Sequence, residues 1–303
     1  ARARARIHVP SVGMQQPASS TSAPWVDKHG PQTLREVCGQ PQVVDLLERY
    51  LDSGALPHLL LHGPSGTGKT SVVRSVVQSL YGARGQNQVL ELNASDERGL
   101  ECVRTQIREC TTCRRMFDDK ARMVVLDECD SMPMPSMMAL RRLMDSAGDN
   151  VRFLLVCNNA GRVLRSLRSR CVSLRFQPLS SDVVVERLHV LCQAEGRAGT
   201  RDDTLAAVAA VSRGDLRRAV NTLQILLTVH AHPTPQIVNA VVGVPLSATV
   251  ARVVRAVGEV GSAPSAEALL TAVQAVARVQ TECGVTLAAL VTALFEAVVA
   301  GDM

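Results

Sequence analysis

No uninterrupted apolar run in this chain reaches the roughly 20 residues that a helix needs to cross a bilayer. This holds although 46% of its 303 residues are hydrophobic. We therefore expect a soluble protein with no membrane partner. An apolar signal segment is also lacking, and the nine cysteines occur at irregular spacings. This combination favours reduced thiols in the cytosol or nucleus over a disulfide framework.

Acidic residues are missing from the amino-terminal region before Asp27. Residues 1–6 alternate Ala and Arg, and Pro, Ser, Thr and Gln follow. We expect residues 1–24 to be a disordered basic tail, because such a segment cannot bury enough apolar surface to fold. An organelle transit peptide, which has the same Arg-rich and acid-poor composition, is the alternative. Since the first residue is not Met, we expect the start to be incomplete.

Five short apolar runs alternate with stretches of helical periodicity between residues 25 and 178. The runs are Leu59–Leu61, Val89–Leu92, Met123–Leu126, Phe153–Cys157 and Cys171–Phe176. Strands that alternate with helices indicate an α/β domain whose five-stranded parallel sheet is covered on both faces.

The strand signal stops at Pro178. The apolar spacing then predicts a small helical domain over residues 179–244, and Gly214-Asp215 reads as a helix stop followed by an N-cap. The expected helices lie near Val183–Glu195, Asp203–Val211, Leu216–Val229 and Pro235–Val241. Residues 245–303 are rich in Ala and Val and predict a third, helical piece.

Residues 63–70 match the phosphate-loop pattern G-x-x-x-x-G-K-[ST]. They follow an apolar strand and precede a helical stretch, which is the context that the motif requires and which disfavours a chance glycine-rich turn. Backbone N–H groups and the helix dipole would bind phosphates there. Lys69 would hold the β and γ phosphates, and Thr70 would ligate Mg²⁺. The predicted nucleotide-binding residues are Gly63, Pro64, Ser65, Gly66, Thr67, Gly68, Lys69 and Thr70.

Two acids, Asp127 and Glu128, end the apolar run Met123–Leu126. Asp127 at the strand end can bind Mg²⁺, and Glu128 can polarise the attacking water. Acids that only favour a helix N-terminus are the alternative. Asn158, after the next strand, could bond the γ-phosphate or the water, although an Asn pair also forms turns. Arg170 lies either on a solvated face or toward a neighbour's nucleotide.

These motifs, in this order, resemble the AAA+ ATPases and, within them, the small subunits of replication factor C, most of all the fourth. The match runs from residue 24 to about 245. Its most specific segments are PWVDK at 24–28, LNASDERG at 92–99, DECDSM at 127–132, SRC at 169–171 and GDLRRA at 214–219.

The resemblance implies an AAA+ ATPase domain over 25–178, a lid over 179–244 and a collar over 245–303 that we expect to be truncated. It implies ATP and Mg²⁺ as cofactors. Asn158 and Arg217 would be sensors of the γ-phosphate, and Arg170 would be an arginine finger that acts on the adjacent subunit's ATP. Val26 would pack on the nucleotide base.

The function so implied is that of a nuclear clamp-loader subunit. It would join the other subunits in a hetero-pentamer and load the sliding clamp onto primer-template DNA in replication and repair. An ATP-binding scaffold with little hydrolysis, or another AAA+ remodeller such as a branch-migration helicase, is the alternative. Arg98, Arg104 and Arg108 would follow DNA phosphates, or else form a solvated basic face.

Four methionines, at positions 132, 134, 137 and 138, follow the second acidic motif. They fit either an adaptable interface with the clamp or the core. Cys102, Cys110 and Cys113 are one ligand short of a structural zinc site, so we expect unligated thiols.

Four positions depart from the family pattern. His29-Gly30 replaces a Tyr-Arg pair, which should weaken base binding. Ser65 replaces a proline in the phosphate loop, which restores a backbone N–H. Met137 replaces a glutamine, so a polar relay from DNA to the active site would lack that side chain.

Overall fold

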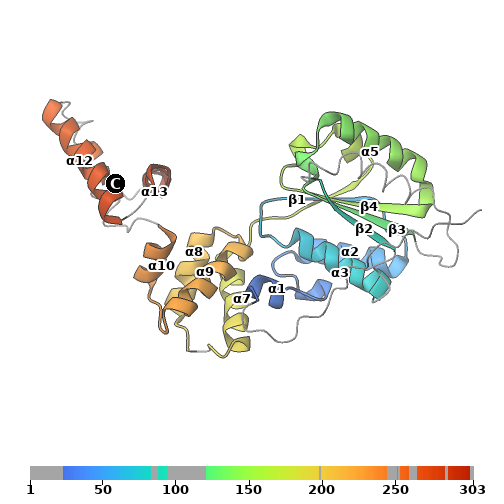
Figure 1. Ribbon diagram of the computed structural model, residues 1–303, viewed down its shortest axis with the longest axis horizontal. Coiled ribbons are helices and arrows are strands. Elements are labelled where there is room, and N and C mark those ends of the chain that lie inside the picture. The colour runs from blue at the N-terminus through green and yellow to red at the C-terminus, as the bar shows by residue number, and fades with distance from the viewer. Residues whose placement is uncertain are drawn as a thin grey trace, which may run out of the picture.

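Five parallel strands form one sheet in the order β2-β3-β4-β1-β5 in the computed structural model (Figure 1). The structure describes residues 23–82, 88–94, 121–197, 199–243, 251, 253–258, 265–283 and 286–300. The strands are β1 Leu59–His62, β2 Val89–Asn93, β3 Arg122–Asp127, β4 Val151–Cys157 and β5 Val172–Arg175. The predicted five-stranded parallel sheet is therefore confirmed, and each expected run overlaps one strand.

Helices cover both faces of this sheet. Successive side chains of each strand point to opposite sides, so each strand contributes to the core on both faces. Leu59 and Leu61 of β1 pack with α2 (Pro41–Ser53) and α3 (Lys69–Tyr81). Leu60 packs on the other face, under α5 (Met134–Ala147). With both faces buried, the strands are apolar at nearly every position, as is usual in parallel sheets.

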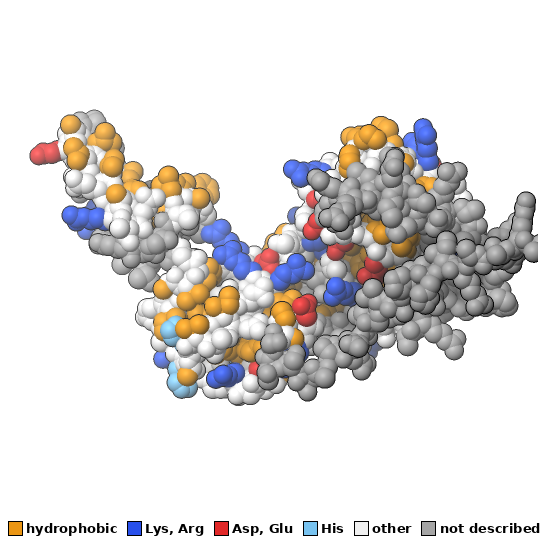
Figure 2. Space-filling view, in the orientation of Figure 1, with side chains coloured by type: hydrophobic (Ala, Val, Ile, Leu, Met, Phe, Trp, Pro, Cys, Tyr) orange, Lys and Arg blue, Asp and Glu red, His pale blue; other side chains and the backbone are white. Residues whose placement is uncertain are grey.

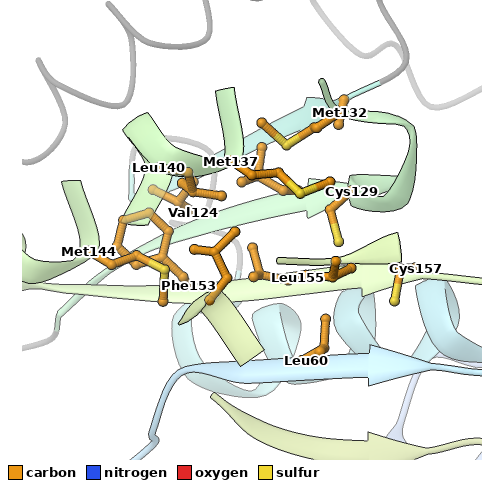
Figure 3. Packing of buried hydrophobic residues seen from close by; sticks show 14 of the residues in the cluster. Leu60, Val124, Cys129, Met132, Met137, Leu140, Met144, Phe153, Leu155 and Cys157 are labelled. Atoms are coloured by element: carbon orange, nitrogen blue, oxygen red, sulfur yellow. The ribbon is translucent and has the colours of Figure 1, made fainter. Parts of the chain in front are cut away.

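The face under α5 separates the four methionines into two pairs. Met132 and Met137 belong to the core that also contains Phe153, and Met137 is only 3% exposed (Figure 3). Met134 and Met138 lie one helical turn apart on the outer side of α5 and are each 53% exposed. Core packing therefore explains the first pair, and the second pair is accessible to a partner.

A second helical layer follows β5. It consists of α7 (Ser181–Ala194), α8 (Asp202–Ser212), α9 (Leu216–Val229) and α10 (Pro235–Val242), and all four predicted helices are present. They enclose a core of their own that includes Leu188, Leu205 and Leu223. Asp215 caps α9 as expected, since its carboxylate accepts a 2.9 Å hydrogen bond from the Arg218 backbone N–H.

The short helix α1 (Trp25–Lys28) lies on this helical layer, although it is the first element of the described chain (Figure 1). The backbone N–H of Trp25 donates to Gln224 Oε1 of α9 at 3.0 Å. Glu195, just after α7, accepts from Lys28 Nζ at 2.7 Å and contacts His29 Nε2 at 2.5 Å. The polypeptide that leads into the α/β domain is thus anchored on this helical layer, which is called the lid below.

The carboxyl-terminal helices α12 (Ala266–Cys283) and α13 (Leu287–Ala300) extend beyond the lid (Figure 1). Val279 of α12 and Leu290 of α13 form a small buried cluster with Val253. Leu269, Leu270, Val273, Val291 and Phe295 are exposed. Within the described part of the chain, no helix is long and apolar enough to cross a membrane.

Several predicted features lie outside the described residues. These are the amino-terminal tail up to residue 22, Arg98, Arg104 and Arg108, and the cysteines at 102, 110 and 113.

Candidate active site

The phosphate loop connects β1 to α3, and its lysine is turned inward. Lys69, the first residue of α3, is only 7% exposed, and its ammonium group donates to the carbonyl oxygens of Gly63 at 2.9 Å and Pro64 at 2.6 Å. Burial lowers the pKa of Lys69, and Asp127 opposes that shift. A buried ammonium held only by neutral carbonyls would gain from an anionic partner such as a phosphate.

The loop glycines are required by close contacts at their α-carbons. A Cβ on Gly63 would lie 2.3 Å from the Phe176 carbonyl oxygen, so the loop rests on the chain that follows β5. Gly66 has φ +65°, and a Cβ there would lie 1.8 Å from Asp215 Oδ1. The phosphate loop is therefore packed between the sheet and the lid helix α9.

Two carboxylates stand at the end of β3, beside the loop. Asp127 Oδ2 accepts from the Thr70 hydroxyl at 3.1 Å, and Asp127 Oδ1 accepts from the Glu128 backbone N–H at 2.8 Å. Glu128 has left-handed backbone angles, with φ 53° and ψ 37°. Such strain at a non-glycine residue typically marks a functional position. Here it turns the chain out of the sheet directly after Asp127.

A cavity of about 310 Å³ joins these groups. Its lining includes residues 65–71, Asp127, Glu128, Asn158 and Arg217. It also includes the apolar side chains Val26, Pro31, Val37, Leu179, Leu191 and Val220, together with His29, Glu36 and Arg187. Charged side chains of both signs gather in the hollow between the lid and the α5 side of the sheet (Figure 2). A cavity lined by a phosphate loop and by apolar side chains suits a molecule that carries both phosphates and a flat ring.

The adjacent asparagines after β4 have different environments. Asn159 forms the turn, since its side chain accepts from the Gly161 backbone N–H at 2.8 Å and its own N–H donates to Asp130. Asn158 instead lines the cavity. The turn-forming alternative therefore applies to Asn159, and Asn158 is available to a ligand.

The lid contributes Arg217, the second residue of α9, and part of the apolar wall. Sequence reasoning missed the wall residues Leu179, Leu191 and Val220. The sequence marks them only as apolar positions in or just before the lid helices, and it does not show that they lie beside residues 26–38. His29 and Gly30 also line the cavity.

Arg170 lies away from this cavity: it is not among the described residues that line it. It is paired with Asp145 of α5 instead, with Nε 2.5 Å from Oδ1 and Nη2 3.2 Å from Oδ2. The structure thus brings together all the predicted phosphate-loop, carboxylate and sensor residues, and it places the predicted finger elsewhere.

The donor set fits a nucleotide with Mg²⁺. The Thr70 hydroxyl and the Asp127 carboxylate are hard oxygen ligands beside a phosphate loop, and Mg²⁺ is usually held by one or two such groups together with substrate phosphates. Among the described residues, no group of three or more His, Cys, Asp or Glu side chains could hold a metal alone. Five of the cysteines, at 38, 129, 157, 171 and 192, are free thiols.

Comparison with known proteins identifies the family of this chain. The model of the ATPase family associated with various cellular activities (AAA) matches residues 59–179. The chain is 32% identical over 279 residues to replication factor C subunit 3 of Schizosaccharomyces pombe, covering 92% of this chain and 79% of that protein. It is 36% identical to human replication factor C subunit 5, covering 79% of this chain and 71% of the relative.

Other similar proteins define how far these likenesses extend. Rice replication factor C subunit 3 is 44% identical over 69% of this chain, but the match spans only 59% of the rice protein. These relatives are named as third and fifth subunits, whereas the sequence pattern suggested the fourth. The solved Thermotoga maritima RuvB branch migration motor matches with a TM-score of 0.56 at 19% identity, covering 85% of this chain and 86% of RuvB, a likeness of fold alone. The chain belongs to the replication factor C small-subunit family of AAA-type ATPases.

Proposed function

We propose that this chain is an ATP-hydrolysing clamp-loader subunit that assembles with other replication factor C subunits. The ring so formed would open a sliding clamp and load it onto primer-template DNA. The observation that carries the proposal is the convergence of Lys69, Thr70, Asp127 and Glu128 on the 310 Å³ cavity. Membership of the family supports the rest.

The residues around the cavity suggest how hydrolysis would proceed. Lys69 would leave the carbonyls of Gly63 and Pro64 and bind the β and γ phosphates. Thr70 and Asp127 would hold Mg²⁺, which supplies positive charge against the phosphates when bound. Glu128, just beyond Asp127, would orient a water molecule and accept its proton.

Two further side chains are suited to the γ-phosphate. Asn158 can donate from its amide, and Arg217 can supply a guanidinium from the lid. Because Arg217 lies on a different layer from Lys69, a γ-phosphate contacted by both would draw the lid toward the sheet. Nucleotide state would then be coupled to the angle between the two layers.

Arg170 would act in trans as an arginine finger. Arg170 does not line the cavity of its own chain. This supports a role in trans, since a finger that served this chain's ATP would have to reach the cavity. Arg98, Arg104 and Arg108 would follow the DNA backbone, and the loader would work in the nucleus. A branch-migration helicase is the weaker alternative, because the likeness to RuvB is one of fold alone.

The test of hydrolysis is Glu128→Gln in the complex reconstituted with its partner subunits. Nucleotide binding to this chain should remain, and turnover at this site should fall by about 10²–10⁴-fold. Glu267→Gln, in the first turn of α12, is the control and should change neither. Unchanged turnover in Glu128→Gln would remove Glu128 from the mechanism.

The test of clamp loading is co-purification. The tagged chain should retain its partner subunits and the sliding clamp when nucleotide is present. A chain that hydrolyses ATP but captures neither would point to the other remodellers. Replacement of Arg98, Arg104 and Arg108 by Ala should lower the salt dependence of duplex binding, by up to about 0.9 in the log–log slope for each lost phosphate contact.

A further inference from the structure

Arg170 is held by three hydrogen bonds that fix the plane of its guanidinium group. Nε and Nη2 donate to the two oxygens of Asp145, and Nη1 donates to the Ser166 carbonyl oxygen at 2.7 Å. The side chain is 34% exposed and that of Asp145 is 44% exposed. A partly exposed ion pair contributes little to stability, so stability is a weak reason for this arrangement.

The hydrogen bonds leave a defined part of the guanidinium unused. Arginine has five N–H donors, and three are occupied here. Among the described residues, nothing accepts the remaining two, of which one is on Nη1 and one on Nη2. A carboxylate bound across Nε and Nη2 leaves the outer edge of the group, where those two N–H bonds can engage two oxygens of a phosphoryl group.

We infer that Asp145 is a positioning residue for Arg170: it orients the guanidinium so that its outer edge faces the neighbouring subunit's nucleotide. This inference rests on the proposed role of Arg170 in trans. Asp145 lies in α5, which is anchored in the sheet core by Leu140 and Met144. The carboxylate therefore fixes the Arg170 side chain, which has several rotatable bonds, relative to a rigid helix.

The charge of Asp145 suits this task. The hydrogen bond from Arg170 lowers the pKa of Asp145, with further help from the charges of Arg170 and Arg141, so the carboxylate remains ionised at neutral pH. Arg141, one turn earlier in α5, approaches the same carboxylate only at 3.9 Å. Asp145 therefore bonds Arg170 with both oxygens and attracts Arg141 only through space.

The experiment uses the complex reconstituted with its partner subunits, with Glu128→Gln in this chain so that its own site is silent. The remaining turnover then includes the neighbour's site that receives Arg170. Asp145→Asn keeps the shape of the side chain but replaces one acceptor by an NH₂ group that cannot accept from Arg170. It should lower the neighbour's kcat by about 10- to 100-fold with little change in KM, as expected for a misplaced catalytic group.

Three comparisons make the result specific to positioning. Arg170→Ala should reduce turnover at the neighbour's site by about 10³-fold, and adding Asp145→Asn to it should cause no further loss. Asp145→Glu, which restores the charge, should recover part of the rate. Arg141→Ala, and Glu48→Gln in the separate Arg35–Glu48 ion pair, should leave turnover unchanged.

Each other outcome overturns a specific statement. If Arg170→Ala has no effect, the proposed role in trans fails, and the inference falls with it. If Arg170→Ala lowers the rate but Asp145→Asn does not, only the inference is wrong. If Asp145→Asn raises the rate, Asp145 restrains the finger instead of positioning it. Nucleotide binding to isolated Asp145→Asn chain should match wild type, which excludes misfolding as the cause of a lost rate.

Discussion

The hydroxyl of Ser65 in the phosphate loop donates a 2.7 Å hydrogen bond to Asp215 Oδ2, at the start of lid helix α9. Asp215 Oδ1 meanwhile caps α9, and the Leu216 backbone N–H donates to the Gly66 carbonyl oxygen at 3.1 Å. One carboxylate thus joins the phosphate loop to the helix that carries Arg217. Proline at position 65, which the family pattern favours, could not make this bond because it has no hydroxyl.

Gly66 should be intolerant of any side chain, because of this contact. A Cβ would lie 1.8 Å from Asp215 Oδ1, so Asp215 would have to move and lose its cap and its bond to Ser65. We expect Gly66→Ala to lower the free energy of unfolding by about 2–4 kcal/mol, from backbone strain, a lost cap and a lost charged hydrogen bond. Denaturant unfolding measures this.

Gly54 provides the matched control for the prediction on Gly66. Its φ is +66°, almost the same as the +65° of Gly66, but a Cβ at position 54 would have no other atom within 4 Å. Gly54→Ala should therefore show only the backbone strain, about 1–2 kcal/mol. Equal losses in the two variants would mean that the lid contact is absent in solution.

Met137 and Met138 should respond oppositely to glutamine. Met137 is 3% exposed and packs near Cys129 and Phe153 (Figure 3), so Met137→Gln would bury an amide without partners. We expect a loss of about 1–3 kcal/mol in the free energy of unfolding. Met138→Gln, at 53% exposure, should change it by less than about 0.5 kcal/mol.

A stable Met137→Gln variant would contradict this assignment. It would mean that α5 can turn or shift so that a glutamine at position 137 reaches water, as the family's polar residue there suggests. Circular dichroism together with denaturant unfolding would distinguish that outcome from a simple loss of stability.

Motifs with a local cause were predictable from the sequence, whereas contacts between distant segments were not. The strands followed from continuous apolar runs, and the cap at Asp215 followed from Gly214 and the helical pattern after it. The phosphate loop needed only its own eight residues and the elements on either side.

The partners of Asp215 and Arg170 could not be found in this way. Ser65 and Asp215 are 150 positions apart, and Asp145 and Arg170 are 25 apart, so no spacing rule links them. The environment of the methionines was predictable only in part. Helical spacing places positions 134 and 138 on a different side of the helix from position 137, but it does not say which side is buried. That depends on where α5 meets the sheet.

Glu195 should make the anchoring of α1 dependent on pH. Hydrogen bonds from Lys28 first, and then from His29, lower the pKa of Glu195 below its ordinary 4.5. A lowered carboxylate pKa contributes stability above the unfolded-state value and loses it as pH falls through the folded-state value. The difference in the free energy of unfolding between wild type and Glu195→Gln should therefore be largest at neutral pH and shrink below about pH 4.5.

Trp25 offers the measurement, since it is the only tryptophan in the chain and lies in α1. Its fluorescence should shift toward that of exposed tryptophan in Glu195→Gln at neutral pH, and in wild type as the pH is lowered. Glu186→Gln, an exposed position on α7, is the control. Identical fluorescence of wild type and Glu195→Gln from pH 7 to pH 3 would show that Glu195 does not hold α1.

Glu128 should be a site where stability and activity conflict. It is one of two non-glycine residues at positive φ in the described chain, the other being Arg213 at the end of α8. Glycine adopts such angles without strain. Glu128→Gly should therefore raise the free energy of unfolding by about 0.5–1 kcal/mol, while turnover at this site falls by the 10²–10⁴-fold expected for loss of a general base.

Arg213→Gly separates these two effects. The position lies outside the cavity lining, so turnover should stay at the wild-type rate whatever happens to stability. Glu128→Ala completes the set, because it removes the carboxylate but keeps the strain: it should lose turnover as Glu128→Gly does without gaining stability. If Glu128→Gly is instead less stable than Glu128→Ala, the left-handed backbone at position 128 is not a strained state, and the carboxylate's placement has a different origin.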